Sequence, residues 1–143
     1  MAISLHKFLG VPFPCGIFLM EKPYLSIAKI KNNIEIIASD DCTISGSRNG
    51  HASIFIKYIL EKKTYQDFKF DIVICIENAE YLVKRIPKSW RNNNSFTVIF
   101  PRPNKKICDK YQLAVDGNIA HIICMQHVDL NILDEFIKDY LKF

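Results

Sequence analysis

The C-terminal segment carries the clearest amphipathic pattern in this chain. Across residues 129–143, apolar side chains recur every three or four positions, which places them on one face of an α-helix. Asp129 precedes the pattern and is a suitable N-cap, because its side chain can accept a hydrogen bond from the first turn. The side chains that we expect this helix to bury are Leu130, Leu133, Phe136, Ile137, Tyr140 and Leu141.

Apolar spacing also predicts helices over residues 25–37, 52–63 and 105–115. Residues 71–86 begin with an alternating, strand-like pattern, but their later apolar positions recur at helical spacing, and we therefore favour a helix there. These later positions are Ile76, Ala79, Leu82, Val83 and Ile86.

Three further segments have the pattern of short β-strands. Residues 11–20 read as a buried strand with a proline-rich entry, and residues 96–100 ("FTVIF") form a β-branched and aromatic run that prolines end. Asp116 and Gly117 predict a turn into a last strand over residues 118–125.

The order of these elements predicts two parts. From about residue 65 onward, helix, strand, helix, strand and helix follow one another, which is typical of a small α+β layer domain. We accordingly divide the chain into residues 1–64 and 65–143. Nothing in the pattern predicts a helix or strand before His6 and Lys7.

Composition narrows the class of protein. Hydrophobic residues make up 49% of the chain and charged residues 24%, which is ordinary for a globular protein. The net charge is +4, but the basic residues are scattered among acidic ones and do not form a cluster, so we expect no nucleic-acid partner. No apolar run approaches the roughly 20 residues of a membrane helix, and no secretory leader pattern is present. We therefore expect a cytoplasmic protein with no membrane contact.

Cysteines and aromatic residues are assigned to packing. The five cysteines are odd in number, widely spaced and without a ligand pair, which favours buried free thiols and no metal site. We expect Trp90 and the Phe and Tyr side chains to form the core, and the isolated histidines His51, His121 and His127 to be satisfied polar residues.

His6 and Lys7 stand in an otherwise apolar run, "AISLHKFLGVPFPCG". A lysine in such a run either reaches solvent with its terminal amine or is an amine kept neutral for attack on a carbonyl. Since no element is predicted before it, most of the pocket of a reactive Lys7 has to come from elsewhere. From these residues alone, a solvated lysine remains the alternative.

The loop "SGSRNGH", residues 45–51, is a second candidate. Its two glycines permit close approach of a ligand, its serines and Arg48 offer donors, and it runs into a helix whose N-terminus favours an anion such as phosphate. A polar surface loop with a capping residue is the alternative interpretation.

Several motifs occur together in a family-specific order. They are Ser4-Leu5-His6-Lys7-Phe8 followed by "PCG", then "ISGSRNGHASIF", "FPRP" and "YQLAVDGNIAHIICM". Over essentially all 143 residues, the chain resembles the C-terminal part of the group II pyridoxal-phosphate-dependent amino-acid decarboxylases, especially histidine decarboxylase and serine decarboxylase. The resemblance implies an α/β fold, namely the C-terminal part of a type I, aspartate-aminotransferase-like enzyme. Residues 1–64 would be the tail of the large cofactor-binding domain, and residues 65–143 the small α+β C-terminal domain.

The resemblance also implies site residues. Lys7 matches the lysine that holds pyridoxal 5′-phosphate as a Schiff base, and His6 and Ser4 match positions close to the cofactor and its phosphate. Ser47 matches a serine that reaches the cofactor phosphate of the neighbouring subunit, which implies a homodimer. The implied reaction converts an amino acid to an amine and CO2, with the cofactor ring accepting the negative charge of the carbanion.

Two departures from the family pattern accompany this resemblance. Leu5 stands where the family usually has a glycine, and its side chain adds bulk where the backbone and the cofactor would be close. The upstream half of the large domain, which stacks on the ring and pairs with its nitrogen, has no counterpart here, so a partner would have to supply it. Three hypotheses follow: a decarboxylase portion that carries Lys7, a non-catalytic remnant or dimerisation module, and an unrelated phosphate-binding module.

Overall fold

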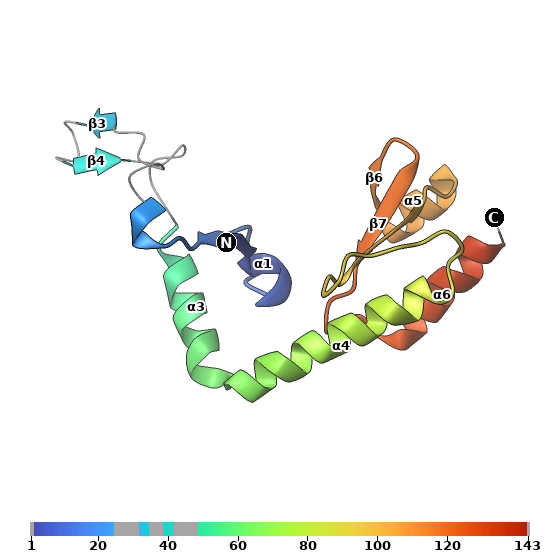
Figure 1. Ribbon diagram of the computed structural model, residues 1–143, viewed down its shortest axis with the longest axis horizontal. Coiled ribbons are helices and arrows are strands. Elements are labelled where there is room, and N and C mark those ends of the chain that lie inside the picture. The colour runs from blue at the N-terminus through green and yellow to red at the C-terminus, as the bar shows by residue number, and fades with distance from the viewer. Residues whose placement is uncertain (1, 25–31, 35–38, 42–48, 143) are drawn as a thin grey trace. The chain divides into compact units, whose positions relative to one another are not determined.

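The computed structural model describes residues 2–24, 32–34, 39–41 and 49–142. The chain divides into two compact units, Met1–Lys62 and Lys63–Phe143, which we call unit 1 and unit 2 (Figure 1).

Unit 2 is built on a three-stranded antiparallel sheet with the strand order β5-β7-β6. Strand β5 (Thr97–Pro101) pairs with β7 (Ile119–Ile123), and β6 (Ala114–Asp116) pairs with the other edge of β7. Gly117, whose φ is +52°, allows the tight turn between β6 and β7. The strands expected near 96–100 and 118–125 are therefore confirmed.

Three helices complete unit 2, and a side-chain cap begins each of them. Helix α4 (Tyr65–Val83) starts with a capping box between Thr64 and Asp67. In α5 (Lys105–Tyr111) the side chain of Asn104 accepts a hydrogen bond from Ile107 N. In α6 (Leu130–Leu141) the side chain of Asp129 accepts one from Asn131 N, as its position in the sequence predicted.

Aromatic packing joins α6 to the sheet. Phe136 on α6 lies with its ring centroid 5.5 Å from that of Phe100 on β5 and 5.1 Å from that of Tyr111 at the end of α5. The Tyr140 hydroxyl donates a hydrogen bond of 2.9 Å to Pro101 O. Leu82 from α4 and Leu133 from α6 are buried in the same core. Helix α4 and helix α6 therefore share one core with the sheet.

Several expected positions differ in unit 2. Leu130 and Leu141 are 50% and 55% exposed, because they occupy the two ends of α6, outside the core that its middle residues join. Trp90 is also 50% exposed. Its backbone bridges to Ile99 at the outer edge of β5, so its side chain lies at a sheet margin.

The helix expected over residues 105–115 ends at Tyr111. Gln112 adopts a left-handed conformation with φ +48°, and residues 114–116 then pair with β7 as strand β6. Sheet pairing outweighed the helical spacing of this short segment, and it adds one strand to the expected element order.

Unit 1 contains the other described elements. They are β1 (Ala2–Ser4), α1 (Leu5–Phe8), β2 (Gly16–Phe18), the 3-10 turn η1 (Lys22–Tyr24), β3 (Asn32–Ile34), β4 (Ser39–Asp41) and α3 (His51–Lys62). Strands β1 and β2 form one antiparallel hairpin, and β3 and β4 form another.

Three expectations for unit 1 can be compared with these elements. The helix expected over residues 52–63 is confirmed as α3. The strand expected over 11–20 is reduced to β2. In the expected helix 25–37, residues 32–34 form a strand instead, since two asparagines disfavour a helix interior and the segment pairs with β4. The remainder of that helix lies outside the described residues.

The buried position of Phe136 predicts a large effect on stability. Phe136 is 1% exposed, and replacing it with alanine should lower the free energy of unfolding by about 3–5 kcal/mol through lost burial and a cavity. Urea denaturation followed by the fluorescence of the single tryptophan, Trp90 of unit 2, measures this change. Ile132→Ala, at a 53% exposed position of the same helix, is the matched control. Equal effects of the two variants would contradict this packing.

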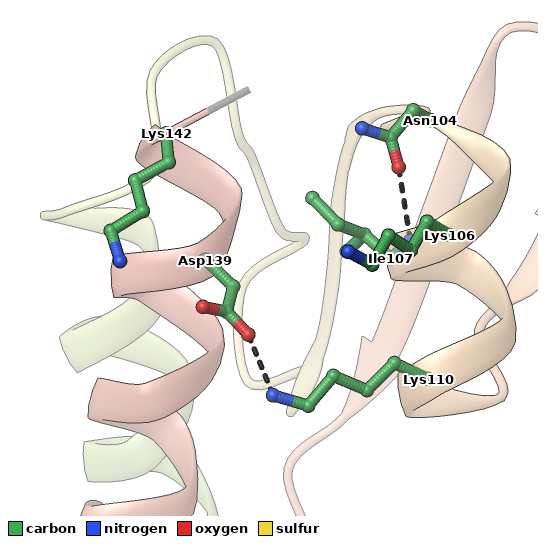
Figure 2. Close-up of a pocket in the computed structure, with 6 residues that line it drawn as sticks. All are labelled: Asn104, Lys106, Ile107, Lys110, Asp139 and Lys142. Atoms are coloured by element: carbon green, nitrogen blue, oxygen red, sulfur yellow. Dashed lines mark hydrogen bonds and ion pairs between the residues drawn. The ribbon is translucent and has the colours of Figure 1, made fainter.

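Helices α5 and α6 are also joined by a charged cluster (Figure 2). The Lys110 amine lies 2.7 Å from Asp139 and 2.6 Å from Glu135, and the Tyr111 hydroxyl donates to Asp139. The hydrogen bonds from Lys110 and then Tyr111 lower the pKa of Asp139 from its ordinary 3.8. Hydrogen bonds to Asp139 and Glu135 raise the pKa of Lys110 above its ordinary 10.5.

These shifts predict a pH window for the stability of unit 2. A lowered carboxyl pKa stabilises the folded state above pH 3.8, and a raised amine pKa stabilises it below pH 10.5. Asp139→Asn should therefore lower the free energy of unfolding by its full amount between these two pH values. This loss of stability should disappear as the pH falls below 3.8 through the folded pKa of Asp139. Urea midpoints measured from pH 2 to 8 test this, with Asp109→Asn as a surface control. A loss that persists unchanged at the lowest pH would exclude ionic stabilisation by Asp139.

Candidate functional site

The segment that contains Ser4, His6 and Lys7 is the turn of the first hairpin in unit 1. Strand β1 pairs with β2 from Ala2↔Phe18 to Ser4↔Gly16, and Leu5 N donates a further hydrogen bond of 3.0 Å to Cys15 O. Helix α1 therefore begins directly where the strand pairing ends. The expectation that no strand precedes Lys7 is wrong, because a three-residue strand is too short to show a periodic pattern.

Burial of Leu5 anchors this turn. Leu5 is 2% exposed and Val11 is 3% exposed. The carbonyl of Leu5 accepts hydrogen bonds from Leu9 N at 3.1 Å and from Val11 N at 3.4 Å. Between these two donors, Gly10 has a φ of +67°, which favours glycine and turns the chain back. Within the motif Ser4–Phe8, Leu5 is thus the residue whose side chain faces inward.

The imidazole of His6 is tied to the same hairpin. His6 Nδ1 lies 3.0 Å from Cys15 O and 3.2 Å from Cys15 N. In one tautomer Nδ1–H donates to the carbonyl, and in the other Nδ1 accepts from the backbone N–H. Either arrangement fixes the ring while the residue remains exposed.

Lys7 is on the solvent-exposed side of this turn. The residue is exposed, and within the described part of the chain its amine has no ion pair or hydrogen bond. Ser4 is also exposed, and its side chain does not cap α1. An amine, an imidazole and a hydroxyl thus occur within four residues on a backbone that Leu5 anchors. The described residues form no apolar enclosure around Lys7.

The second candidate, the loop 45–51, is described only from Asn49 onward. Ser47 and Arg48 lie outside the described residues. Asn49 Oδ1 accepts a hydrogen bond of 3.0 Å from His51 N and lies 3.1 Å from His51 Nδ1. Asn49 therefore holds the turn that leads into α3, a role that its place two residues before the helix could have indicated. This contact gives the His51 imidazole a hydrogen-bond partner, as expected for a satisfied polar residue.

Three cysteines are confirmed as packing residues. Cys75, Cys108 and Cys124 are buried, and burial raises the pKa of the Cys124 thiol to about 12. Burial likewise raises the pKa of Cys75. Such thiols are protonated at neutral pH and are poor nucleophiles. Cys15 is half-buried, and Cys42 lies outside the described residues.

The described residues contain neither a metal-ligand cluster nor a membrane-spanning helix. No three His, Cys, Asp or Glu side chains gather there as a metal ion would require. None of the helices in that part of the chain has the length and apolar character needed to cross a bilayer.

Known proteins align with almost the whole of this chain in sequence. No family model matches the chain. Serine decarboxylase 1 of Oryza sativa subsp. japonica is 39% identical over 144 residues, which cover 97% of this chain and 30% of the rice protein. Histidine decarboxylase of Vibrio campbellii is 38% identical over 146 residues, which cover 99% of this chain and 37% of that protein.

Solved structures of a decarboxylase also match almost the whole chain. L-methionine decarboxylase from Streptomyces sp. 590, in its internal aldimine form, matches 99% of this chain with a TM-score of 0.76 and 27% identity. The same enzyme in complex with L-methionine methyl ester, in its external aldimine form, matches with a TM-score of 0.77 and 26% identity. In each case the chain covers 31% of the solved chain. It thus spans about a third of the length of the relatives it matches.

The anchoring of the turn by Leu5 generates a prediction. Leu5→Ala should destabilise the hairpin by about 2–5 kcal/mol, because it removes a side chain that is 2% exposed. Faster amide hydrogen exchange across residues 2–18 measures this local loss. Phe18→Ala, at a 65% exposed position of β2, should leave the exchange of α1 nearly unchanged. Similar exchange in the two variants would show that Leu5 does not hold the turn.

Proposed function

Since the chain belongs to the group II pyridoxal-phosphate-dependent amino-acid decarboxylases, in the histidine and serine decarboxylase subgroup, we propose that it forms the C-terminal portion of such an enzyme and contributes Lys7 as the cofactor-binding amine. The single observation that carries this proposal is 38% identity to a histidine decarboxylase over 99% of the chain, a coverage that includes the Ser4–Lys7 turn. The expected family and the expected fold class are confirmed by these relatives.

We assign the two parts of the chain accordingly. Residues 1–64 would be the tail of the large, cofactor-binding domain, and residues 65–143 would be the small α+β domain. Unit 2 has a core of its own, formed by α4, α5, α6 and one sheet, which supports the second assignment. Unit 1 carries the turn with Lys7, which supports the first.

The chemistry of the turn fits pyridoxal 5′-phosphate. Lys7 offers an amine that no described carboxylate neutralises, and Ser4 offers a hydroxyl that α1 does not use as a cap. His6 is held by Cys15 through Nδ1, which leaves Nε2 as the second ring nitrogen for a ligand. These three groups are suited to an aldehyde and a phosphate. Ser47 would reach the cofactor phosphate of a second subunit in a homodimer.

Bound at this turn, the cofactor would supply the electron sink that makes loss of CO2 from an amino acid possible. Lys7 would hold it covalently through Nζ, and the anchored backbone of α1 would fix the direction of that amine. Ser4 and His6 would bind polar groups beside it. Because histidine and serine decarboxylases both match the chain, we propose an amino acid as the substrate and an amine and CO2 as products.

The exposure of Lys7 bears on the activity of this chain by itself. A site for decarboxylation needs a low-dielectric enclosure, whereas Ser4, His6 and Lys7 are all exposed. The relatives are about three times as long as the matched region. We therefore propose that the remaining part of a decarboxylase completes the site, in a cytoplasmic enzyme, and that the isolated chain is inactive. A non-catalytic module of a longer decarboxylase is the second candidate, which the same exposure favours.

Covalent trapping at Lys7 tests the proposal. The chain is mixed with pyridoxal 5′-phosphate and the N-terminal part of Vibrio campbellii histidine decarboxylase that this chain does not match, and the mixture is reduced with borohydride. Peptide mapping should place the pyridoxyl mass on Lys7. Lys7→Ala should abolish this label, and Lys22→Ala, which removes another exposed lysine of unit 1, should retain it.

Product formation from histidine and serine is measured on the same mixtures. We expect amine from the mixture with wild-type chain and none from the chain alone. Label on other lysines only, at an occupancy that Lys7→Ala leaves unchanged, would overturn the role of Lys7. Labelling of Lys7 without amine from either substrate would favour the non-catalytic module.

A further inference from the structure

Helix α3 (His51–Lys62) is apolar on most of its circumference and yet buries none of its side chains. Ile54 is 65% exposed, Tyr58 is 59% exposed and Leu60 is 58% exposed. Phe55 is 37% exposed and packs its ring on Phe13 at a centroid distance of 5.7 Å. A helix with this composition is ordinarily enclosed by protein.

The exposed apolar residues do not lie on one side of α3. Ile54 and Tyr58 are four positions apart and share one row, since an α-helix has 3.6 residues per turn. Leu60 is six positions from Ile54 and therefore lies on a different side. Between them, Ile56 and Ile59 are half-buried. A flat surface could cover only one of these sides, so full coverage requires a partner that surrounds the helix.

The charges of α3 argue against a membrane surface as that partner. A helix that lies on an anionic bilayer combines one apolar face with a cationic face. Here Lys57 is paired with Glu61 on α3 at 3.6 Å, and apolar residues occupy more than one side. A single face of a second copy would likewise leave one side uncovered.

The length of the relatives indicates which partner can surround α3. The solved decarboxylase contains this fold as 31% of its chain, so more than two-thirds of its length has no counterpart in the 143 residues. Resting on the proposed function, we propose that α3 is the docking element for the N-terminal part of a decarboxylase, which encloses the Ile54–Tyr58 row and Leu60. The same association would bring protein over the exposed Lys7 of unit 1.

Affinity measurements on surface variants test this docking site. The chain is titrated with the N-terminal part of Vibrio campbellii histidine decarboxylase described above, and the matching C-terminal part of the Vibrio enzyme serves as the positive control. Ile54→Gln combined with Tyr58→Gln should weaken binding roughly tenfold or more, because buried apolar anchors dominate such interfaces. Leu130→Gln combined with Ile132→Gln, at exposed apolar positions of α6, should leave the affinity unchanged. Circular dichroism of each variant checks that its helices are intact.

Hydrogen exchange gives a second measurement that does not depend on affinity. When the chain is alone and monomeric, the amides of α3 should exchange fast. They should become protected when the N-terminal part is added. A homodimer of the chain alone that protects α3 and that the Ile54/Tyr58 variant dissociates would overturn the proposal in favour of a second copy. Binding that the Ile54/Tyr58 variant leaves unaltered would overturn it as well, as would assembly of the Vibrio pair but not of this chain.

The outcomes separate this inference from the proposed function. Affinity measures the docking of α3, and the borohydride label measures the role of Lys7, so the two proposals are tested by separate readouts. A complex that needs Ile54 and Tyr58 but carries no label on Lys7 would leave the docking site standing and remove the proposed role of Lys7. Labelling of Lys7 in a complex that the α3 variants do not weaken would do the reverse.

Discussion

The inward packing of Leu5 is the constraint on which the candidate site depends. Its side chain is buried, its N–H is bonded to Cys15 O, and its carbonyl accepts from Leu9 and Val11. Because consecutive residues of a single helical turn point in different directions, anchoring Leu5 leaves His6 and Lys7 on the outer side. The residue that departs from the family pattern is thus the one that holds the motif in place.

The two units differ in how far they satisfy their own apolar residues. Unit 2 encloses Phe100, Leu133 and Phe136 between one sheet and its helices, and each of those helices has a capped start. In unit 1, α3 has no buried residue although more than half of its residues are apolar. Burial of apolar area is the main stabilising term in folding, so unit 1 has most to gain from a partner.

The proposed association with the rest of a decarboxylase would account for the exposure of Lys7 and for the exposure of α3 together. A reactive amine needs a dry enclosure for its chemistry, and an apolar helix needs protein around it. Lys7 and α3 both lie in unit 1. The part of a decarboxylase that this chain does not span would provide the enclosure that each of them needs. Unit 2, whose helices and sheet cover one another, does not depend on that addition for its core.

Local pattern in the sequence determined the long helices, the Asp129 cap and strands β5 and β7, since periodicity and capping act within a few residues. The motifs likewise identified the family and singled out Lys7. The sequence did not reveal β1, β6 or the strand at residues 32–34, because each has only three residues and forms by pairing with another strand, which outweighs the propensity of so short a segment. Tertiary structure alone decided that Leu5 faces inward while Lys7 is exposed, and that Leu130, Leu141 and Trp90 lie at margins of the core, because burial depends on what packs against a residue and not on its own spacing.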